Sequence, residues 1–412
     1  MAQAGIADMI EIDELNHATI LWNLHQRYFK DDIYTYVGPT LLAVNPFMAL
    51  DKKFPPSVIE DYKQIMQAEE NYLEVMRSLP AHTYAVAAYA HKQLIVTKTR
   101  QAIVIAGESG AGKTEAAKLA MAFLTALGSK NVDESKGPLA TRILSTNPVL
   151  EAFGNSRTAR NDNSSRFGKY IKLYFDKEDG LCVGAENKNY LLEKSRVIGC
   201  TPVERNYHIF FFILRGAPDV TAKRLGMTDA KGARKHYSAF RYLATCNDIR
   251  TFKDKDGNEK KESMEARDLK DYAELAAAFV SLGFPQPEID AIHDVTAAAL
   301  HCGELVLDPS TFDDGKANTP VSITSTAVVA QIATLLGIQN PQDLVTEVVM
   351  KGALEGVAAR SPDKLTNVEN AVGSLAKGLF DNMFNWLVVS MNQEILPEAL
   401  KSPSPSELNA FE

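Results

Sequence analysis

Residues 107–114 read GESGAGKT and place glycines, a lysine and a hydroxyl at the spacing G-x-x-x-x-G-K-[ST]. Gly107 and Gly112 allow main-chain angles and close approaches that a Cβ would block. The ammonium of Lys113 can reach the β- and γ-phosphates of a nucleotide, and the hydroxyl of Thr114 can ligate Mg²⁺. The pattern therefore predicts a site for a nucleoside triphosphate.

The segments on either side of this loop fit the same interpretation. Residues 101–106, QAIVIA, are apolar and rich in β-branched side chains, which predicts a buried parallel strand. Residues 114–128, TEAAKLAMAFLTALG, are strong helix formers that stop at Gly128. Strand, glycine loop and helix in this order direct backbone N–H groups at a polyphosphate. A glycine-rich turn without a ligand is the less favoured alternative.

Composition places the chain among soluble globular proteins. Its 412 residues suffice for two or three subdomains, and its 45% hydrophobic and 23% charged content is ordinary. No apolar run approaches a membrane span, and the acidic N-terminus lacks the features of a secretory signal. The net charge of −8 argues against nonspecific nucleic-acid binding. We expect a cytoplasmic protein.

The cysteines are scattered and show no C-x-x-C spacing. They are Cys182, Cys200, Cys246 and Cys302. Reduced thiols in the cytosol explain them better than a zinc site or a disulfide framework.

The first third of the chain alternates strand and helix patterns. Residues 33–47 predict two β-rich runs broken at Gly38-Pro39, and residues 57–79 predict a helix. A polar loop at 128–138 precedes a helix through TRILSTNPVLEAFG. Residues 169–193 predict a hairpin that turns at Asp179-Gly180.

Beyond residue 205 the predicted elements are mainly helices. They cover IFFFILRG, residues 264–282 and 288–302, and TSTAVVAQIATLLG, with polar loops at 253–268 and 308–320. Residues 371–395 predict one long amphipathic helix with core residues spaced by three and four. Those core residues are Leu375, Leu379, Phe380, Met383, Phe384 and Leu387. The Pro/Ser-rich tail after residue 396 is predicted to be a mobile loop.

A second polar constellation, NDNSSRFGK at residues 161–169, narrows the choice among phosphate-loop proteins. On its own such a run is usually a solvated loop. Downstream of a phosphate loop, a functional role becomes more favoured than a solvated loop. The hydroxyls of this run can complete the Mg²⁺ shell and hold a water for in-line attack on a γ-phosphate.

The two motifs together resemble those of the myosin motor head, where they are the phosphate loop and switch I. Further similar stretches follow the family's order along nearly the whole chain. They are IYTYVG (33–38), AVNPF (43–47), NPVLEAFGN (147–155), LLEKSRV (191–197), ERNYHIFF (204–211) and GLFDNMFNWLVVSMN (378–392). Kinesins share an N-x-x-S-S-R loop but usually follow it with Ser-His, so a kinesin-like or other phosphate-loop ATPase is the weaker alternative.

The resemblance implies a role for each matching residue. The implied catalytic residues are Lys113, which would contact the β- and γ-phosphates, Ser164, which would lie beside the attacking water, Ser165 and Arg166. Arg166 would pair with a glutamate of the family's switch II. Thr114 and Ser165 would supply oxygens to Mg²⁺, Asn161 would contact the phosphates, and Asn45-Pro46 would lie near the purine. The implied ATP-binding set is Asn45, Pro46, Gly107, Glu108, Ser109, Gly110, Ala111, Gly112, Lys113, Thr114, Glu115, Asn161 and Asn163.

One motif of the family is missing from the sequence. Switch II is a D-x-x-G-F-E run after an apolar strand, whereas the D-x-x-G runs at 229–232 and 254–257 lie in polar loops. In the family that strand follows the helix predicted at 371–395. We therefore expect a partial head without the relay helix, lower actin-binding subdomain, converter or light-chain-binding lever arm. The Tyr usual after Asn45-Pro46 is also absent, and Phe54 could stack on the purine in its place, which leaves adenine selectivity open.

The predicted fold class is α/β. It comprises a phosphate-loop NTPase core, with a mixed sheet flanked by helices, followed by a mainly helical subdomain, together an incomplete myosin-type motor head. We place a nucleotide-binding subdomain at residues 1–130 and an upper-50-kDa-like subdomain with switch I at residues 131–412.

Two functions remain open at this point. The favoured one is an actin-based, cytoskeleton-associated motor ATPase that binds ATP and Mg²⁺, with slow or negligible hydrolysis by these 412 residues alone. The alternative is a non-motor ATP-binding protein that uses its helical half for partner contacts. In a chain without neighbours, the broad apolar face of the 371–395 helix is expected to be an exposed patch that leads to aggregation or recruits a partner.

Overall fold

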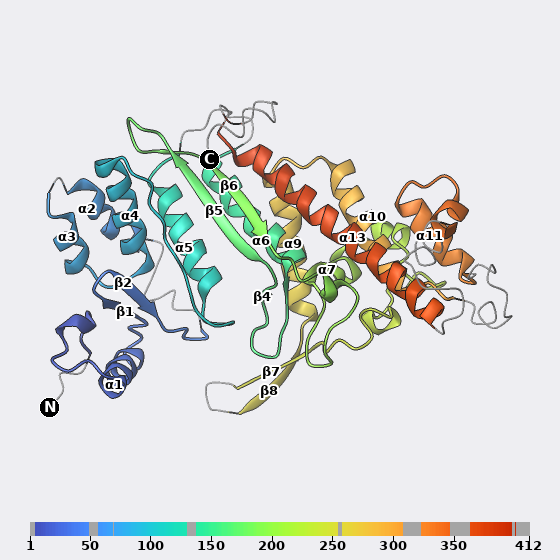
Figure 1. Cartoon of the computed structure of the whole chain (residues 1–412), viewed down its shortest axis with the longest axis horizontal. Coiled ribbons are helices and arrows are strands. Elements are labelled where there is room, and N and C mark those ends of the chain that lie inside the picture. The colour runs from blue at the N-terminus through green and yellow to red at the C-terminus, as the bar shows by residue number, and fades with distance from the viewer. Residues whose placement is uncertain are drawn as a thin grey trace. The chain divides into compact units, whose positions relative to one another are not determined.

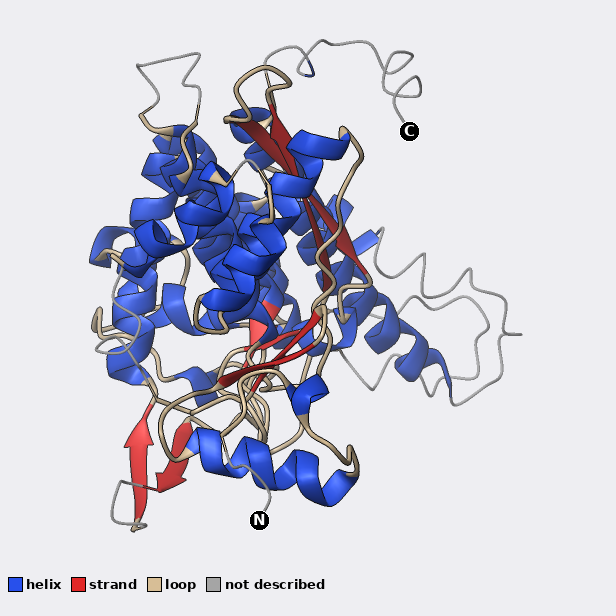
Figure 2. Ribbon diagram, turned by 90° about the vertical axis from the view of Figure 1, so that its left-hand side faces the viewer, coloured by secondary structure: helices blue, strands red, loops and turns tan. Residues whose placement is uncertain are grey.

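The computed structural model describes residues 5–48, 57–68, 70–129, 137–253, 258–307, 323–346, 363–397 and 400. Helices predominate among the described elements (Figure 2). The chain divides into two compact units. Unit 1 comprises residues 1–144, 173–185 and 396–412, and unit 2 comprises residues 145–172 and 186–395.

Unit 1 holds a β-hairpin and a group of helices (Figure 1). Its elements are η1 (Met9–Glu11), α1 (His17–Tyr28), β1 (Tyr34–Val37), β2 (Thr40–Ala43), α2 (Val58–Gln67), α3 (Tyr72–Ser78), α4 (Thr83–Thr97) and α5 (Lys113–Ala126). Three further elements cross the unit boundary: α6 (Leu139–Gly154), β5 (Gly168–Phe175) and β6 (Cys182–Tyr190).

Local sequence explains most of these elements. β1 and β2 pair antiparallel from Tyr34 opposite Ala43 to Val37 opposite Thr40, because aromatic and β-branched residues favour strands and Gly38 takes a positive φ of 57° at the turn. This confirms the two predicted β runs. The single helix predicted at 57–79 is wrong, since left-handed Asn71 (φ 56°) separates α2 from α3.

The core of unit 1 forms where α2 and α5 pack on α4. Alanines on α4, including Ala85 and Ala88, are fully buried and let the neighbouring helices approach closely. Tyr62 of α2 and Phe123 of α5 fill the space beside them. This core fixes the position of α5 and therefore of residues 107–112, which lead into its N-terminus.

The strand predicted at 101–106 is not present. These residues join α4 to α5 without a strand assignment, and the side chain of Val104 is 87% exposed. A buried parallel strand needs ladder partners, and no described segment forms one with these residues. The described strands form four two-stranded sheets, so the mixed sheet expected from the sequence is not seen in this part of the chain.

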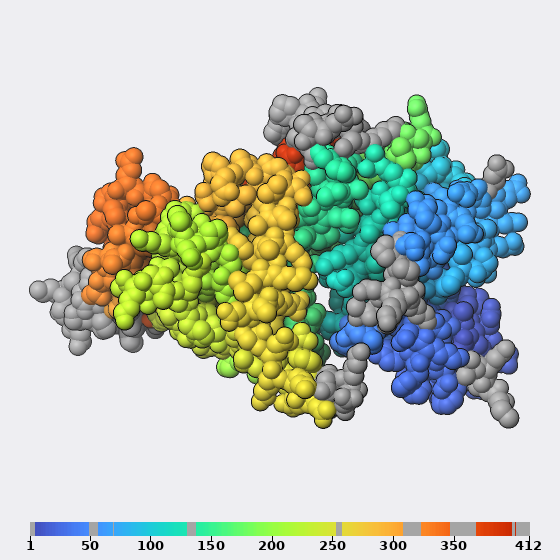
Figure 3. All heavy atoms as spheres, turned by 180° about the vertical axis from the view of Figure 1, so that it is seen from behind, coloured from blue at the N-terminus to red at the C-terminus, as the bar shows by residue number. Residues whose placement is uncertain are grey.

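Unit 2 is mainly helical. Its elements are β3 (Asn155–Ser156), β4 (Ser164–Ser165), η3 (Lys194–Val197), α7 (His208–Gly216), α8 (Asp219–Arg224), η4 (Tyr237–Ala239), β7 (Ile249–Lys253), β8 (Glu259–Ser263), α9 (Glu265–Ser281), α10 (Gln286–His301), η5 (Cys302–Glu304), α11 (Thr326–Leu335) and α13 (Asp363–Ile395). On the face shown in Figure 3, the gold surface of α9 and α10 lies beside the yellow-green surface of the segment after α7.

The core of unit 2 gathers around α7 and α13. The residues from His208 to Leu214 in α7 are all buried, as its uninterrupted apolar run predicts. Phe380 of α13 is fully buried and its ring lies 5.0 Å from that of Tyr207 and 5.5 Å from that of Phe210. The apolar face of α13 also packs on α10.

The long C-terminal helix is confirmed, but its expected exposure is not. Phe380, Phe384 and Leu387 are at most 1% exposed, because α10 and η3 cover this face within the described chain. The prediction of a broad exposed apolar patch on this helix is therefore wrong. Only its outer positions, such as Trp386 and Val389, face solvent.

The polar loop predicted at 253–268 is also partly wrong. β7 and β8 form an antiparallel hairpin there, and α9 begins at Glu265. The hairpin is surface-exposed and rich in charge, with Arg250 opposite Glu262, which hides the usual strand pattern. Residues 254–257 lie outside the described residues. The other D-x-x-G run is a polar turn, as expected, in which Asp229 accepts hydrogen bonds from the amides of Lys231 and Ala233.

Candidate functional site

The glycine loop at 107–114 lies at the N-terminus of α5. Three of its glycines adopt positive φ angles, 155° at Gly107, 84° at Gly110 and 96° at Gly112. Such conformations strain other residues, and a Cβ at Gly107 would also lie 3.1 Å from the Cβ of Ala111. Backbone amides in this kind of loop, beside a helix N-terminus, form a concave site suited to an anion.

Two side chains hold the loop in this shape. The Lys113 ammonium donates to the carbonyl oxygens of Gly107 and Glu108, at 2.7 and 2.8 Å. The amide of Asn45 donates to the carbonyl of Gly110 at 2.6 Å. The structure thus brings Asn45, predicted for the purine side, directly against the phosphate loop. Phe54 lies outside the described residues.

These residues fit a Mg²⁺-bound triphosphate. No atom lies within 4 Å of the position that a Cβ on Gly112 would take, and the Lys113 ammonium lies against the loop carbonyls of Gly107 and Glu108. The predicted metal ligands, Thr114 and Ser165, carry hydroxyl oxygens, the donor type that Mg²⁺ prefers. Thr114 is the second residue of α5 and so sits beside the loop.

The NDNSSR motif forms a short antiparallel ribbon, in which β3 pairs with β4. Asn163 anchors the connecting loop. Its amide nitrogen donates to Glu151 at 2.9 Å, and its amide oxygen accepts from Asn155 at 2.9 Å and lies 3.2 Å from Nε2 of His208. Asn161 accepts from the amide of Asn163 at 3.0 Å. Both predicted asparagines therefore shape the loop itself.

His208 is a neutral support for this loop. It is buried in α7, and this burial, reinforced by the charges of Arg205 and Arg267, holds its pKa well below the usual value. A neutral ring adds no charge beside Asn163.

The serines of the motif differ in exposure. Ser164 is buried and its hydroxyl accepts from Nη1 of Arg166 at 3.2 Å. Ser165 is exposed and donates to the carbonyl of Phe167 at 2.9 Å.

Arg166 pairs with Glu193, whose Oε2 lies 2.5 Å from its Nε. The same carboxylate accepts from Nε of Arg196 at 2.8 Å. Burial alone would raise the pKa of Glu193, but the hydrogen bonds from Arg196 and Arg166 outweigh it and hold that pKa below its usual value. The sequence contains no D-x-x-G-F-E glutamate, and Glu193 is the partner of Arg166 in this structure.

A buried ionic network lies next to the NDNSSR segment and is joined to the residues before it through the backbone of Arg205. Arg205, fully buried, makes two hydrogen bonds to Asp268 at 2.7 and 3.2 Å, and Arg215 binds both Asp268 and Asp248. Two cations and two anions balance within the network, as buried charges require. The backbone amide of Arg205 donates to the carbonyl of Arg157, which precedes the NDNSSR segment.

The predicted site residues thus form two groups. Asn45 and the residues of the phosphate loop belong to unit 1, whereas Asn161 to Arg166 belong to unit 2. Sequence reasoning assigned no role to the residues that hold the NDNSSR segment, namely Glu151, Asn155, Glu193, Arg196 and His208. All five occur in the stretches NPVLEAFGN, LLEKSRV and ERNYHIFF, which were the available signal.

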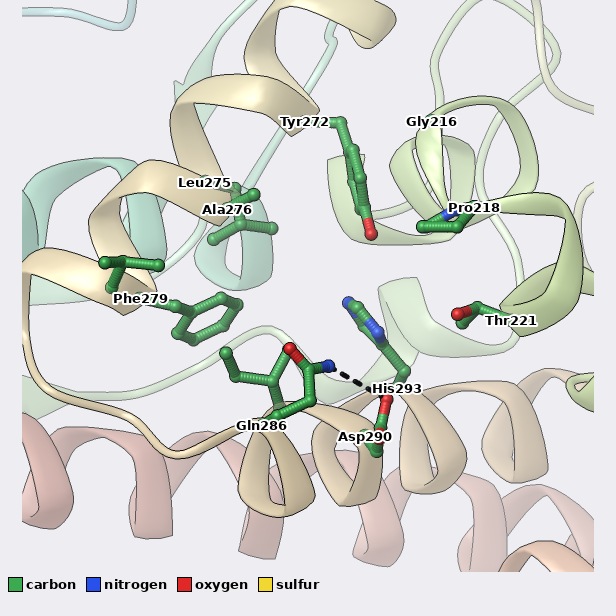
Figure 4. Close-up of a pocket in the computed structure, with 12 residues that line it drawn as sticks. Gly216, Pro218, Thr221, Tyr272, Leu275, Ala276, Phe279, Gln286, Asp290 and His293 are labelled. Atoms are coloured by element: carbon green, nitrogen blue, oxygen red, sulfur yellow. Dashed lines mark hydrogen bonds between the residues drawn. The ribbon is translucent and has the colours of Figure 1, made fainter.

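A separate cavity of about 240 Å³ lies between α9, α10 and residues 216–221 (Figure 4). The side chains of Tyr272, Phe279 and His293 point into it, and Gln286 donates to Asp290 beside it. None of the predicted site residues lines this cavity. Burial lowers the pKa of His293 to about 4, and neither ring nitrogen has a hydrogen-bond partner among the described residues.

The glycine loop lies at the N-terminus of α5, and the NDNSSR segment forms a ribbon held by polar contacts with Glu151, Glu193 and His208. The family model of the myosin head (motor domain) matches residues 6–404. The chain therefore belongs to the myosin head family.

Relatives from distant organisms agree with this assignment. Myosin heavy chain 95F of Drosophila melanogaster is 35% identical over 94% of this chain and 31% of its own length. Myosin-1 of Pyricularia oryzae is 34% identical over 99% of this chain and 31% of its own length. Myosin IE heavy chain of Dictyostelium discoideum is 32% identical over 97% of this chain and 37% of its own length. The chain spans about a third of the length of these relatives. Among the described helices, none is long and apolar enough to cross a membrane.

Proposed function

We propose that this chain carries the phosphate loop and switch I of an actin-based motor ATPase, and that it binds ATP with Mg²⁺. The observation that carries the proposal is the arrangement at the start of α5. Positive-φ glycines, the N-terminus of α5 and the Lys113 ammonium come together there, the combination that suits a phosphate group.

Lys113 would exchange its present hydrogen bonds for phosphate oxygens. Its ammonium now satisfies the carbonyls of Gly107 and Glu108 at the lip of the loop, so a small rotation of a flexible side chain frees it. The remaining loop residues, from Glu108 to Glu115, would surround the phosphates with backbone amides. Asn45 and Pro46 would border the purine, because Asn45 already contacts Gly110.

Thr114 and Ser165 would hold Mg²⁺ through their hydroxyls, and the metal would offset charge on the phosphate oxygens. Asn161 would contact the phosphates. Ser164 would lie beside the water that attacks the γ-phosphate, and Arg166 keeps that hydroxyl in place through its hydrogen bond. Because the sequence lacks a D-x-x-G-F-E motif, we expect slow or negligible hydrolysis by these residues alone.

In a complete head, nucleotide-dependent ordering of switch I would alter affinity for actin and move a converter, with light chains bound further along. For this chain we propose a nucleotide-binding subdomain at 1–130, an upper-50-kDa-like subdomain at 131–412, and a cytoplasmic, cytoskeleton-associated location. Membership of the myosin head family supports the proposed location and role in a motor, whereas the subdomain bounds rest on the change in sequence character along the chain.

Titration with a fluorescent ATP analogue in the presence of Mg²⁺ tests the proposal. Lys113→Ala should weaken binding by about 10- to 100-fold, because a charged hydrogen bond to phosphate is lost. Lys118→Ala is the matched control, since Lys118 lies further along α5 and pairs with Glu115 at 3.1 Å on the surface. Equal losses in both variants, or no binding by the unmodified chain, would overturn the proposal.

One observation favours a second candidate, a non-motor ATP-binding protein whose helical unit contacts partners. The apolar face of α13 is packed within unit 2, so this helix does not depend on further segments to cover it. Nucleotide binding by a monodisperse chain that neither sediments with actin filaments nor changes affinity for them with ATP would support this candidate.

A further inference from the structure

Two cysteines that are far apart in the sequence meet in unit 2. The Sγ atoms of Cys200 and Cys246 lie 3.4 Å apart. A disulfide requires about 2 Å, so the sulfurs need to approach by only a little more than 1 Å. Cys200 lies in the segment after η3 and Cys246 in the segment before β7, and neither cysteine is part of a helix or strand.

We propose that Cys200 and Cys246 form a reversible dithiol–disulfide site, oxidised by hydrogen peroxide, that restrains the segments supporting switch I. Cys246 is the nucleophile and Cys200 is the resolving thiol. This site lies apart from the phosphate loop and from the residues assigned to ATP and Mg²⁺.

The environment of the pair matches this division of roles. Cys246 is 7% exposed and Cys200 is half-buried, so a small oxidant reaches the pair from the side of Cys200. The hydrogen bond from Cys200 lowers the pKa of Cys246, assisted by Asn206 and by the charge of Arg205, against the opposing effect of burial. Reactive cysteines typically combine a stabilised thiolate with partial access.

The other two cysteines provide an internal contrast. Cys182 and Cys302 are fully buried, and burial raises the pKa of both thiols, that of Cys302 to about 12. Buried thiols in apolar surroundings are inert. We therefore expect oxidation to select the Cys200–Cys246 pair.

The chemistry balances with one peroxide for each pair. The Cys246 thiolate attacks a peroxide oxygen, the O–O bond breaks, and a sulfenic acid forms while the departing hydroxide takes a proton and leaves as water. The Cys200 thiol then loses its proton and attacks the sulfenic sulfur, so that the S–S bond forms, the S–O bond breaks and a second water leaves. Two electrons pass from the two thiols to the peroxide, and a dithiol reductant returns them.

The disulfide would tie together two segments that both hold switch I. The residue after Cys246, Asn247, accepts from Arg157 through its carbonyl at 2.8 Å and donates to the carbonyl of Glu204 at 2.9 Å. On the Cys200 side, Arg196 of η3 binds Glu193, the partner of Arg166. A disulfide would therefore connect the segment that binds Arg157, before the switch I loop, to the segment that binds Arg166, at its end.

Peptide mapping of the whole chain after brief peroxide treatment tests the site. We expect a linked peptide pair containing Cys200 and Cys246, loss of two of the four thiols, recovery on reduction, and a rise in melting temperature of a few degrees. In Cys200→Ser, Cys246 should give a sulfenic acid that dimedone traps, without a linked peptide. Cys182→Ser is the matched control and should form the linked pair normally. Oxidation of Cys182 or Cys302 without the linked pair would overturn the proposal in the unmodified chain, whether or not a variant folds.

The restraint of switch I by the disulfide rests on the proposed function and is tested by a separate measurement. Release of a fluorescent nucleotide should slow by about fivefold or more in the oxidised chain, the low end of typical couplings between sites. An unchanged release rate with the disulfide formed would overturn the restraint on switch I. Failure of the chain to bind nucleotide would instead refute the proposed function, while the mapping result would still decide the disulfide.

Discussion

Arg166 and Glu193 join the NDNSSR segment to the chain around η3. Arg166 donates to Glu193 and to the Ser164 hydroxyl, while Glu193 also accepts from Arg196. One carboxylate thus fixes two guanidinium groups, one in the switch and one in η3. The side chains of Arg166 and Glu193 are 26% and 34% exposed. The free energy that this ion pair contributes to stability therefore lies between that of a surface pair and that of a buried pair.

Replacing Glu193 by Gln should lower the free energy of unfolding by about 1–2 kcal/mol and loosen switch I, because two charged hydrogen bonds weaken together. Urea denaturation measures the first effect, and nucleotide affinity measures the second. Glu274→Gln serves as control, since Glu274 forms an exposed pair with Lys270 worth less than about 0.5 kcal/mol. Similar losses in both variants would contradict a special role for Glu193.

At the scale of elements, the junction between α6 and β3 holds the end of the NDNSSR segment in place. Gly154, the last residue of α6, accepts from the amide of Arg166 at 2.9 Å. The ring of Phe167 covers it so closely that a Cβ there would lie 2.2 Å from Phe167 Cε1. The stretch NPVLEAFGN was recognised from the sequence, but the need for a glycine at its penultimate position is visible only once Phe167 is in place.

Gly154→Ala should therefore displace Phe167 and lower the melting temperature, since the methyl group has no space to occupy. Gly378→Ala in α13 is the control. No atom lies within 4 Å of its added Cβ, and alanine favours a helix interior by about 0.5–1 kcal/mol. Differential scanning calorimetry compares the two. A neutral Gly154→Ala would show that Phe167 yields freely and would weaken this account of the junction.

Helix packing can be tested on α13 with a similar contrast. Phe380→Ala should cost about 3–5 kcal/mol, because its ring is fully buried against Phe153, Tyr207 and Phe210. Val389→Ala, on the exposed side of the same helix, should cost under about 1 kcal/mol. Urea midpoints measure both. Comparable costs would mean that the apolar face is not packed as described.

Much of the element order could be predicted from the sequence, because strongly periodic helices and the first hairpin depend on local pattern. The missing strand at 101–106 depends on ladder partners, which no local pattern supplies. The charges of the β7–β8 hairpin obscured its strand pattern. The apolar face of α13 is covered by α10, which ends at His301, whereas α13 begins at Asp363. The site motifs were visible, but Glu193 and the Cys200–Cys246 contact depend on tertiary structure.

At the scale of the whole molecule, buried histidines make the stability of both units depend on pH. Five of the eight histidines are buried: His82, His91, His208, His293 and His301. Burial lowers the pKa of every one of them, and that of His82 and His293 reaches about 4. The folded chain keeps these rings neutral, whereas the unfolded chain protonates them below about pH 6.5.

Stability should consequently be complete above pH 6.5 and fall as the pH drops toward 4, because the unfolded state then binds more protons. His293 alone would account for about 3 kcal/mol over that range. His293→Leu should reduce the difference in melting temperature between pH 7 and pH 5, whereas exposed His17→Leu should not change it. An unaltered difference in His293→Leu would contradict the assignment.

The central proposal is that this chain binds ATP together with Mg²⁺ through the residues of the phosphate loop and switch I. A single-turnover experiment with γ-labelled ATP tests it most directly, by measuring bound nucleotide and released phosphate in one sample with and without Mg²⁺. We predict Mg²⁺-dependent binding that approaches one ATP per chain, with phosphate release orders of magnitude slower than in an intact motor. Absence of Mg²⁺-dependent binding would contradict the assignment of the site, and turnover at the rate of an intact motor would contradict the expected slow hydrolysis.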